Sequence, residues 1–479
     1  MKIFVLNPPF VKDFCRSARW AARSRGRVQR HPDGLLTLVA HLQKHGHEVG
    51  FLDGPVSNLD RQGIKELLKN FAPQMFIFHT TTPSIYSDLE YAHDVKHILP
   101  ECLTVALGAH VTALTDETFR FAAANYENSL DAIAVGEFEF SLAELAGSPE
   151  KISEIPGIAS FKDQKLCFQR RKNGNLNELP FPAWNLIKPE NYRDGGKRFP
   201  FLTLINARGC IGNCIFCRDH SSIGAGALRQ RSPELVVEEM EYDLQLFPQI
   251  QEIMFETDSF TAIRRYTEDL CRLMIKKGLN KRIAWSCNTR VDMDLELLPL
   301  MKEAGCRMLM TGFEFGTQAA LDAVKKGVSL EQSVKFAHMA NRLGFTIHGC
   351  FMIGAPGETE ESAQKTIDFA KSLPCDTVQF SGLCPYPGTE LYEWAKTNGF
   401  LIPRDWTEWV DENHEQCTLL NYPQLPKERI DYYIDRGLKE FFLRPRQIAK
   451  MILNIRSFSD IRRKLYGLKS FLDYFGSKK

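Results

Sequence analysis

Short apolar runs alternate with amphipathic stretches of helical length along the first 145 residues. The runs cover residues 2–6, 48–52, 75–79, 103–107 and 132–135. Five apolar strands separated by helices predict a doubly wound parallel sheet. Ligands of such a sheet bind beside the carboxyl ends of its strands, so the residues that follow each run are the first candidates for a binding site.

The same alternation returns six times between residues 196 and 400. The strand candidates cover residues 202–205, 253–256, 283–288, 308–313, 346–353 and 377–383. Six parallel βα units predict a partial (β/α)6 barrel with its functional residues at the carboxyl ends of the strands. Pro385 and Pro387 follow the sixth run and cannot continue a central strand, so the barrel is expected to end there.

Two other regions break this pattern. Residues 146–195 are interrupted by prolines at positions 156, 180, 182 and 189 and predict a linker with a short hairpin. Residues 401–479 are irregular at first and helical from Pro426 onward. The predicted fold class is therefore α/β, with an N-terminal Rossmann-like domain (1–145), the linker (146–195), a partial barrel domain (196–400) and a mainly helical C-terminal region (401–479).

Composition narrows the classes of function. The 479 residues carry a net charge of +1, which gives no electrostatic reason to expect binding to nucleic acid. The 13 cysteines are an odd number and most lie singly in apolar runs, as reduced cytosolic thiols do. The first apolar run is too short for a signal peptide and no run is long enough for a transmembrane segment, so we expect a cytoplasmic protein.

Three cysteines, Cys210, Cys214 and Cys217, lie within eight positions directly after the first strand of the predicted barrel. Thiolates this close together converge on one metal centre, and three of them on a four-iron cluster leave one iron open to an external chelator. The same residues could instead form a zinc site with His220 as the fourth ligand, or remain unconnected buried thiols. A zinc knuckle would not need the long βα chain that follows, which favours the iron–sulfur cluster.

The motif Cys210-x3-Cys214-x2-Cys217, with Phe216 before the last cysteine, resembles the signature of the radical SAM superfamily. The resemblance extends over residues 200–400 and implies a [4Fe-4S] cluster held by these cysteines, with S-adenosyl-L-methionine (SAM) chelated to it. It places the end of the second barrel strand beside the amino group of SAM, Glu314 near the ribose, and Gly354 at the adenine. The residues that the resemblance implies for SAM binding are Glu256, Asp258, Asn288, Arg290, Glu314 and Gly354.

The N-terminal domain resembles the cobalamin-binding domain that precedes the barrel in one large subfamily. The shared features are a proline-rich loop after the first strand, a Gly-x-His loop and a Gly-Glu loop. The residues that this resemblance implies for cobalamin binding are Asn7, Pro8, Thr80, Thr81, Gly108, His110, Gly136 and Glu137. The chain lacks the Asp-x-His-x-x-Gly motif whose histidine ligates cobalt, so we expect cobalamin to bind without a histidine ligand. Other members of the subfamily keep this domain as a scaffold without the cofactor.

Six arginines lie in the loop-like stretch between residues 16 and 30. Guanidinium groups bind phosphate and carboxylate groups through paired hydrogen bonds, so the stretch could hold an anionic group of a ligand. A solvated loop that contacts no ligand is an equal alternative. The six are Arg16, Arg19, Arg23, Arg25, Arg27 and Arg30.

The resemblances imply a radical SAM enzyme in which an electron cleaves SAM and the resulting 5′-deoxyadenosyl radical removes a hydrogen atom from an unactivated carbon. With cobalamin bound, the expected outcome is C-methylation of a small-molecule, lipid or natural-product substrate. A radical dehydration, rearrangement or ring closure is the alternative enzyme, and a cluster- or zinc-bearing sensor is the alternative outside enzymes. The electron is expected from a donor such as flavodoxin or ferredoxin.

Overall fold

The computed structural model describes residues 1–127, 129–162, 165–217 and 228–453, together with residues 461, 464–465, 467–469 and 474. These residues form two compact units. The first unit consists of Met1–Tyr192 and the separate segment Arg404–Glu415, and the second unit contains the other described residues.

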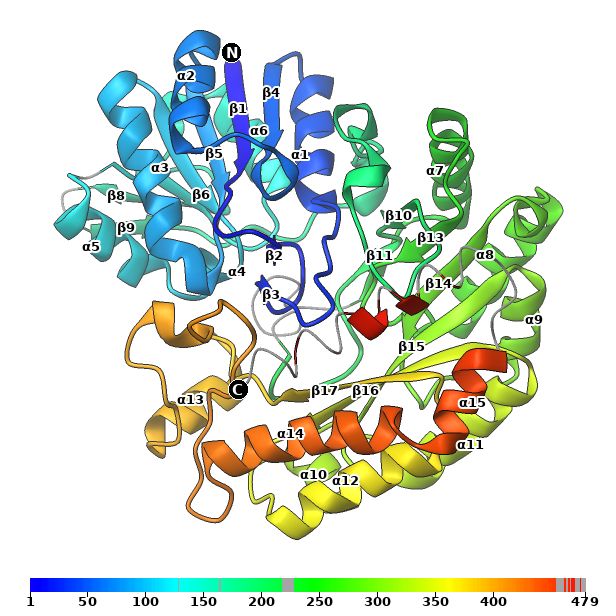
Figure 1. Ribbon diagram of the computed structural model, residues 1–479. Helices are drawn as coiled ribbons and strands as arrows, with labels where there is room; N and C mark the ends of the chain where they lie inside the picture. The colour runs from blue at the N-terminus through cyan, green and yellow to red at the C-terminus, as the bar shows by residue number, and fades with distance from the viewer. Residues whose placement is uncertain are drawn as a thin grey trace. The chain divides into compact units, whose positions relative to one another are not determined.

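The first unit is built on a seven-stranded sheet in the order β4-β1-β5-β6-β7-β8-β9 (Figure 1). Its parallel strands are β1 (Lys2–Asn7), β4 (Glu48–Asp53), β5 (Met75–His79), β6 (Leu103–Leu107) and β7 (Ala132–Ala134). The antiparallel strands β8 (Ile158–Lys162) and β9 (Lys165–Phe168) extend the sheet beyond residue 145. The strand order reverses between β1 and β5, which is the point where ligands of doubly wound sheets bind.

Helices cover both faces of this sheet because its strands alternate apolar side chains between the faces. Ile3 and Val5 of β1 lie in one core with α1 (Asp33–Lys44) and α6 (Glu139–Gly147). Phe4 and Leu6 lie in the other core, against helices on the opposite face. Those helices are α2 (Arg61–Phe71), α3 (Ile85–Ile98) and α5 (Thr115–Asn125). The short helix α4 (Ala109–Ala113) follows β6, and the ribbon of β2 (Phe14–Cys15) and β3 (Ala22–Arg23) follows β1.

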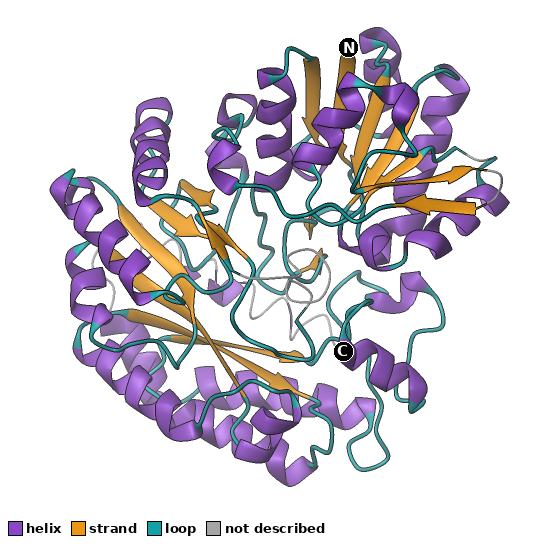
Figure 2. Ribbon diagram, turned by 180° about the vertical axis from the view of Figure 1, so that it is seen from behind, coloured by secondary structure: helices purple, strands orange, loops and turns teal. Residues whose placement is uncertain are grey.

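The second unit is built on a six-stranded parallel sheet in the order β10-β13-β14-β15-β16-β17. The strands are β10 (Phe201–Leu204), β13 (Glu252–Phe255), β14 (Ala284–Thr289), β15 (Cys306–Glu314), β16 (Thr346–Ile353) and β17 (Thr377–Gly382). Strands β10 and β17 are its two edges, so the barrel is open. Figure 2 shows the helices of this unit along the outer side of the curved sheet. The small ribbon of β11 (Ala207–Arg208) and β12 (Arg229–Gln230) follows β10.

Helices follow each strand of the second sheet, and those between strands return the chain so that every strand runs in the same direction. They are α7 (Pro233–Leu246), α8 (Arg264–Lys276), α9 (Leu297–Glu303), α10 (Gln318–Ala323), α11 (Leu330–Arg342), α12 (Glu360–Ser372) and α13 (Glu390–Thr397). Ser329 and Thr359 begin α11 and α12 with reciprocal capping boxes. Gly344 follows α11 with φ +74°, a left-handed conformation that lets the chain turn into β16.

The C-terminal part of the second unit is helical, with α14 (Lys427–Phe442) followed by α15 (Pro445–Leu453). Among the described residues, no helix combines the length and the apolar character needed to cross a bilayer. The predicted fold class is confirmed, including the helical C-terminal region. The parallel strands of both sheets begin and end within about two residues of their predicted limits, because buried parallel strands are nearly continuous apolar runs.

Candidate active site

The three cysteines of the motif lie on one loop after β10 and β11. The Cys214 thiol is buried and those of Cys210 and Cys217 are half-buried, and none of the described cysteines forms a disulfide. The Cys217 amide donates to the Cys214 carbonyl at 3.1 Å, and the Gly212 amide lies 3.3 Å from the Cys210 sulfur. The first bond closes a turn between Cys214 and Cys217, and the second brings a backbone amide to the Cys210 sulfur. His220, the alternative fourth zinc ligand, lies outside the described residues.

Backbone hydrogen bonds fix this loop to the second unit. The Ile215 amide donates to the Val324 carbonyl at 3.2 Å, and the Ile215 carbonyl accepts from the Leu391 amide at 3.0 Å. The loop is therefore held in place at its centre, between Cys214 and Cys217. Three thiols on a fixed loop match the donor set of a cubane cluster with one open iron, so the residues fit the predicted cofactor.

Arg290 and Lys326 place two cations next to the cysteine loop. A Cβ atom on Gly212 would lie 2.7 Å from Nη1 of Arg290, so the guanidinium packs directly against the loop backbone. Arg290 also donates to the Lys326 carbonyl and to Asp292, both at 2.9 Å. Burial raises the pKa of the Cys214 thiol, while the charges of Lys326 and Arg290 act to lower it. The two cations therefore favour the thiolate that a metal ligand requires.

Glu314, the predicted ribose contact, forms a buried ion pair with Lys326. The distance from Nζ to Oε1 is 2.7 Å, and both residues are less than one-tenth exposed. The sheet register shifts between Gly312 and Glu314, and Glu314 adopts φ +65°. A Cβ on Gly312 would lie 2.1 Å from Oε1 of Glu314, so only glycine lets the carboxylate fold back over the strand. Burial by itself would lower the pKa of Lys326, but the charges of Glu314 and Cys214 and the hydrogen bond to Glu314 together outweigh it, so the pKa is raised.

The predicted residues Glu256, Asp258 and Asn288 lie at the ends of neighbouring strands. Glu256 and Asp258 follow β13, and the Glu256 amide donates to the Leu204 carbonyl of β10 at 3.0 Å. The Asn288 side chain donates to the Thr257 carbonyl at 3.0 Å, and the Asn288 carbonyl accepts from the Phe260 amide at 3.1 Å. Asn288 therefore holds the loop that carries the two carboxylates.

Gly354 follows β16, and its polar backbone atoms are engaged by two side chains. Its amide donates to Oε2 of Glu358 at 2.5 Å, and its carbonyl accepts from the Tyr422 hydroxyl at 3.0 Å. Glu358 also accepts from the Ala355 amide at 3.0 Å. Burial raises the pKa of Glu358 to about 7, although the two amide hydrogen bonds act to lower it. The end of β16 is thus fixed by a carboxylate that the sequence analysis had not selected.

All the predicted SAM residues therefore lie at the carboxyl edge of the second sheet, which also carries the cysteine loop. The sequence analysis missed Lys326, although this residue forms the ion pair with Glu314 and accepts a hydrogen bond from Arg290. Lys326 lies in the polar run after α10, where no periodic pattern or motif distinguishes it from Lys325. Its contact with Glu314 exists only once β15 and this turn have come together.

At the carboxyl edge of the first sheet, four side chains form a hydrogen-bonded network. The Asn7 amide donates to Asp53 at 2.7 Å, and the Tyr192 hydroxyl donates to the other Asp53 oxygen at 2.6 Å. Nδ1 of His79 lies 3.1 Å from the Asn7 oxygen. Burial raises the pKa of Asp53 to about 6, against the effect of both hydrogen bonds. The network joins β1, β4 and β5 across the point where the strand order reverses.

The predicted residues Thr80, Thr81 and Gly108 lie in the loops after β5 and β6. The Thr80 hydroxyl donates to the Leu107 carbonyl at 2.9 Å, and the Thr81 hydroxyl lies 2.5 Å from that of Ser84. Gly108 has φ +128°, and a Cβ there would lie 2.4 Å from the Thr80 carbonyl oxygen. The two loops therefore approach so closely that only glycine fits between them.

Asn7 and Pro8 end β1, and Gly136 and Glu137 follow β7, so these predicted residues also lie at the carboxyl edge of the first sheet. The Gly136 amide donates to the Thr112 hydroxyl at 3.0 Å. A Cβ on Gly136 would meet no atom within 4 Å, which leaves open space beside this loop. Small residues and hydroxyls at this edge, with open space beside Gly136, fit the predicted cobalamin-binding residues.

His110 is covered by the separate segment of the first unit, residues 404–415. Its ring lies edge-on to Trp406 with centroids 5.0 Å apart, and Nδ1 lies 3.3 Å from the Thr82 hydroxyl. The Tyr86 hydroxyl donates to Asp405 at 2.6 Å and the Trp406 indole donates to Glu117 at 3.1 Å, which fastens the segment. Burial lowers the pKa of His110 to about 3, so the ring stays neutral. Its place agrees with a hydrogen-bonded structural residue.

Two arginines of the predicted basic stretch have structural partners in the first unit. Arg16 forms a fully buried ion pair with Asp88 at 2.6 Å, and Asp88 also accepts from the Thr81 amide at 3.2 Å. Arg27 pairs with Glu415 of the covering segment at 2.7 Å. These two guanidinium groups therefore hold loops of the protein together.

Comparisons with known proteins agree with this geometry. A family model described as the radical SAM superfamily matches residues 205–370. An uncharacterized methyltransferase of Pyrococcus horikoshii, PH0819, is 30% identical over 439 residues, which cover 90% of this chain and 92% of that protein. Cytidylyl-2-hydroxyethylphosphonate methyltransferase of Streptomyces wedmorensis is 28% identical over 444 residues, covering 78% of this chain and 79% of that protein.

A solved structure extends the similarity to the whole fold. It is that of the radical S-adenosylmethionine methyltransferase TsrM from Kitasatospora setae with cobalamin and a [4Fe-4S] cluster bound. The TM-score is 0.70 at 14% sequence identity, and the match covers 99% of each chain. At this identity the similarity concerns the fold, and it includes both units.

Proposed function

Because this chain belongs to the radical SAM superfamily, we propose that it is a cobalamin-dependent methyltransferase acting on an unactivated carbon of a small-molecule, lipid or natural-product substrate. The observation that carries this proposal is the methyltransferase relative of 30% identity, because its match spans 90% of the chain and therefore includes both sheets. The two other similar proteins described above are also methyltransferases by name.

In the second unit, Cys210, Cys214 and Cys217 would hold the cluster, and Arg290 and Lys326 would stabilise the three thiolates. Lys326 also supplies a buried ammonium beside Cys214, where it can bind the carboxylate of SAM. Glu314 can accept hydrogen bonds from the ribose hydroxyls. When bound, the cluster supplies the electron that cleaves SAM, and cobalamin supplies a methyl carrier.

In the first unit, the loops after β1, β5, β6 and β7 would line the cobalamin site. His110 would not ligate cobalt, because Trp406 covers its ring and the Thr82 hydroxyl lies beside Nδ1. Apart from Glu137, the remaining predicted contacts are backbone groups and small side chains, which suit a ligand held by its shape. An electron donor such as flavodoxin or ferredoxin completes the proposed system.

The test uses the full chain, expressed with ample cobalamin and reconstituted anaerobically with iron and sulfide. We expect cluster iron with equimolar acid-labile sulfide, and about one corrin per chain. After reduction with excess SAM, the products expected are 5′-deoxyadenosine and S-adenosylhomocysteine, the second requiring methyl transfer. An intact cluster without corrin or S-adenosylhomocysteine would contradict methylation and favour radical dehydration, rearrangement or ring closure. Bound zinc without sulfide would contradict a radical enzyme altogether.

A further inference from the structure

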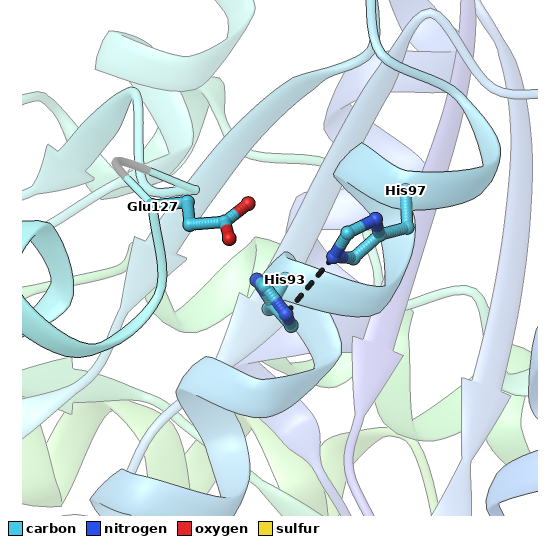
Figure 3. Close-up of side chains that lie close together, drawn as sticks. All are labelled: His93, His97 and Glu127. Carbon is cyan, nitrogen blue, oxygen red and sulfur yellow. Dashed lines mark hydrogen bonds between the residues drawn. The ribbon is translucent and has the colours of Figure 1, made fainter.

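His93 and His97 lie one turn apart on the same face of α3 in the first unit. Their Nε2 atoms are 3.0 Å apart, and their rings are perpendicular with centroids at 4.3 Å. Glu127, in the turn after α5, points toward both rings (Figure 3). One ligand atom of each of the three residues lies within 4.8 Å of the others. Among the described residues, no other three ligand atoms from histidine, cysteine, aspartate or glutamate lie this close to one another.

The turn that carries Glu127 is anchored to α3 by aromatic contacts. The Tyr126 hydroxyl donates to the Tyr86 carbonyl of α3 at 3.3 Å, and the Tyr126 ring lies 5.8 Å from that of His93. Phe121 of α5 stacks on Tyr86 of α3 at 4.5 Å. Glu127 itself adopts φ +51°, a conformation that costs energy for a residue with a side chain. The protein thus tolerates local strain at the residue whose carboxylate faces the two imidazoles.

We propose that His93, His97 and Glu127 form a zinc site that is separate from the cluster and from the cobalamin loops. Two histidines at this helical spacing and one carboxylate are a known donor set for tetrahedral zinc with one open position for water. Bonds of roughly 2.1 Å at tetrahedral angles place neighbouring donors roughly 3.4 Å apart, close to the 3.0 Å between the imidazole nitrogens. Glu127 is exposed, so its carboxylate can complete the set by changing rotamer.

Such a site would join α3 to the end of α5, two helices that cover the same face of the first sheet. Leu89 and Val95 of α3 and Phe119 of α5 lie in one apolar core there. Metal that binds only the folded arrangement stabilises it by mass action. The proposed site would therefore raise the thermal stability of the first unit. The proposed methyl transfer does not require it.

The chain provides a matched control in a second pair of histidines. His41 in the last turn of α1 and His45, the residue that directly follows this helix, have the same spacing, with ring centroids 4.5 Å apart, but no third ligand completes a metal-binding group with them in the part of the chain that the structure describes. The His41 ring is buried, and burial lowers its pKa to about 4. Replacing the exposed His45 removes an imidazole from a histidine pair of the same spacing at the end of a helix.

The experiment compares zinc binding by the reconstituted full chain with that of three variants. Equilibrium dialysis against zinc should show one zinc less per chain in the double variant His93→Gln/His97→Gln, with iron content unchanged. Glu127→Gln should weaken binding of that zinc at least roughly tenfold, and His45→Gln should leave it unchanged. X-ray absorption at the zinc edge should show nitrogen and oxygen neighbours without sulfur, which separates this site from cysteine-bound zinc.

Thermal melting gives a second measurement on the same proteins. Zinc should raise the midpoint of the wild type and of His45→Gln, and leave that of the double variant unchanged. Equal zinc content in the double variant and the wild type would overturn the proposal. So would sulfur ligation, or an equal loss of zinc in His45→Gln.

Discussion

At the carboxyl edge of the first sheet, Asn7 and Tyr192 both donate hydrogen bonds to Asp53, whereas the same edge of the second sheet gathers three thiols beside two cations. Both edges arise from the same βα alternation and the same parallel direction of the strands. The first offers hydroxyls, backbone groups and a covered histidine, which can bind a ligand without reacting with it. The second offers thiolate ligands and buried charge, which can hold a redox centre. The topology therefore fixes where the sites lie, and the side chains at the strand ends decide what each can do.

The largest effect is expected when a cysteine of the second unit is replaced and compared with the same replacement in the first unit. Cys214→Ala should reduce the iron content from about four per chain to none and abolish reductive cleavage of SAM, because the remaining two thiols cannot hold a cubane cluster. Cys167→Ala, on β9 of the first unit, should leave both quantities unchanged. Iron and labile sulfide are measured after anaerobic reconstitution, and 5′-deoxyadenosine after reduction. A cluster that survives in Cys214→Ala would contradict the assigned ligand.

The second effect tests the buried charge at the edge of the second sheet. Glu314→Gln and Lys326→Met should each weaken SAM binding roughly tenfold to a hundredfold with iron content retained, because each removes a charged hydrogen-bonding group. Lys326→Met also leaves a buried carboxylate unpaired, which costs roughly 3–5 kcal/mol of stability. The double variant should recover much of that stability without recovering affinity.

The neighbouring Lys325 provides the control for this pair. Its ion pair with Glu390 is exposed on both sides, so Lys325→Met should leave SAM affinity and stability almost unchanged. Equilibrium binding of SAM and the thermal midpoint measure the two effects. Equal SAM affinity in the wild type and Lys326→Met would remove Lys326 from the site.

The third effect concerns a buried carboxylate at each edge. The pKa of Asp53 is raised to about 6 and that of Glu358 to about 7, so both carboxyls are more easily ionised in the unfolded chain. In the protonated form each carboxyl contributes to the free energy of unfolding, and this contribution is full below about pH 4. It is lost as the pH rises through about 6 for Asp53 and about 7 for Glu358. Each loss amounts to roughly 3 kcal/mol.

Replacing each carboxyl should therefore flatten the dependence of the melting temperature on pH in a different window. Glu358→Gln should remove the decrease between about pH 4.5 and 7, and Asp53→Asn the decrease between about pH 4 and 6. The thermal midpoint, measured at a fixed heating rate across pH 4–8, checks both. A midpoint that falls equally steeply in Glu358→Gln and in the wild type would show that this carboxyl is not the cause.

The smallest expected effect is at His110. His110→Ala should leave the absorption spectrum of bound corrin unchanged, because the ring is packed against Trp406 and does not ligate cobalt. In Trp406→Ala, the pKa of His110 should rise from about 3 toward its ordinary value as burial is relieved. Titration of the histidine proton signals by NMR measures the second effect. A corrin spectrum altered in His110→Ala would contradict a structural role for this histidine.

The sequence predicted the strands and the cysteine loop well because both are local signals. The run at residues 75–79 coincides with β5, and the three cysteines follow β10 as the barrel geometry requires. Glu358 was missed although its partners, the Gly354 and Ala355 amides, are local, because no motif marks its carboxylate and its burial exists only in the folded protein. Lys326 was missed because folding alone brings Glu314 of β15 to it. Tyr192 was missed for the same reason, since Asp53 lies 139 positions earlier in the chain.

The packing of Trp406 over His110 could not be predicted from the sequence for a related reason. Trp406 was visible only as part of an irregular stretch after the barrel, and nothing local connects it to a histidine in the first sheet. The predicted site residues of both edges follow strands, so their positions could be predicted from the alternation of apolar strands and amphipathic helices along the chain. The contacts that neutralise, cover or pair them depend on tertiary packing.

The discontinuous make-up of the first unit has a consequence for the order in which the protein is made. Residues 193–403 separate its two parts in the chain, and at roughly 5–20 residues per second a ribosome needs roughly 10–40 s to add them. During that interval the nascent first sheet has all its strands but lacks Asp405 for Tyr86 and Trp406 for His110. The first unit to begin folding is therefore completed only after the whole second sheet has been synthesised.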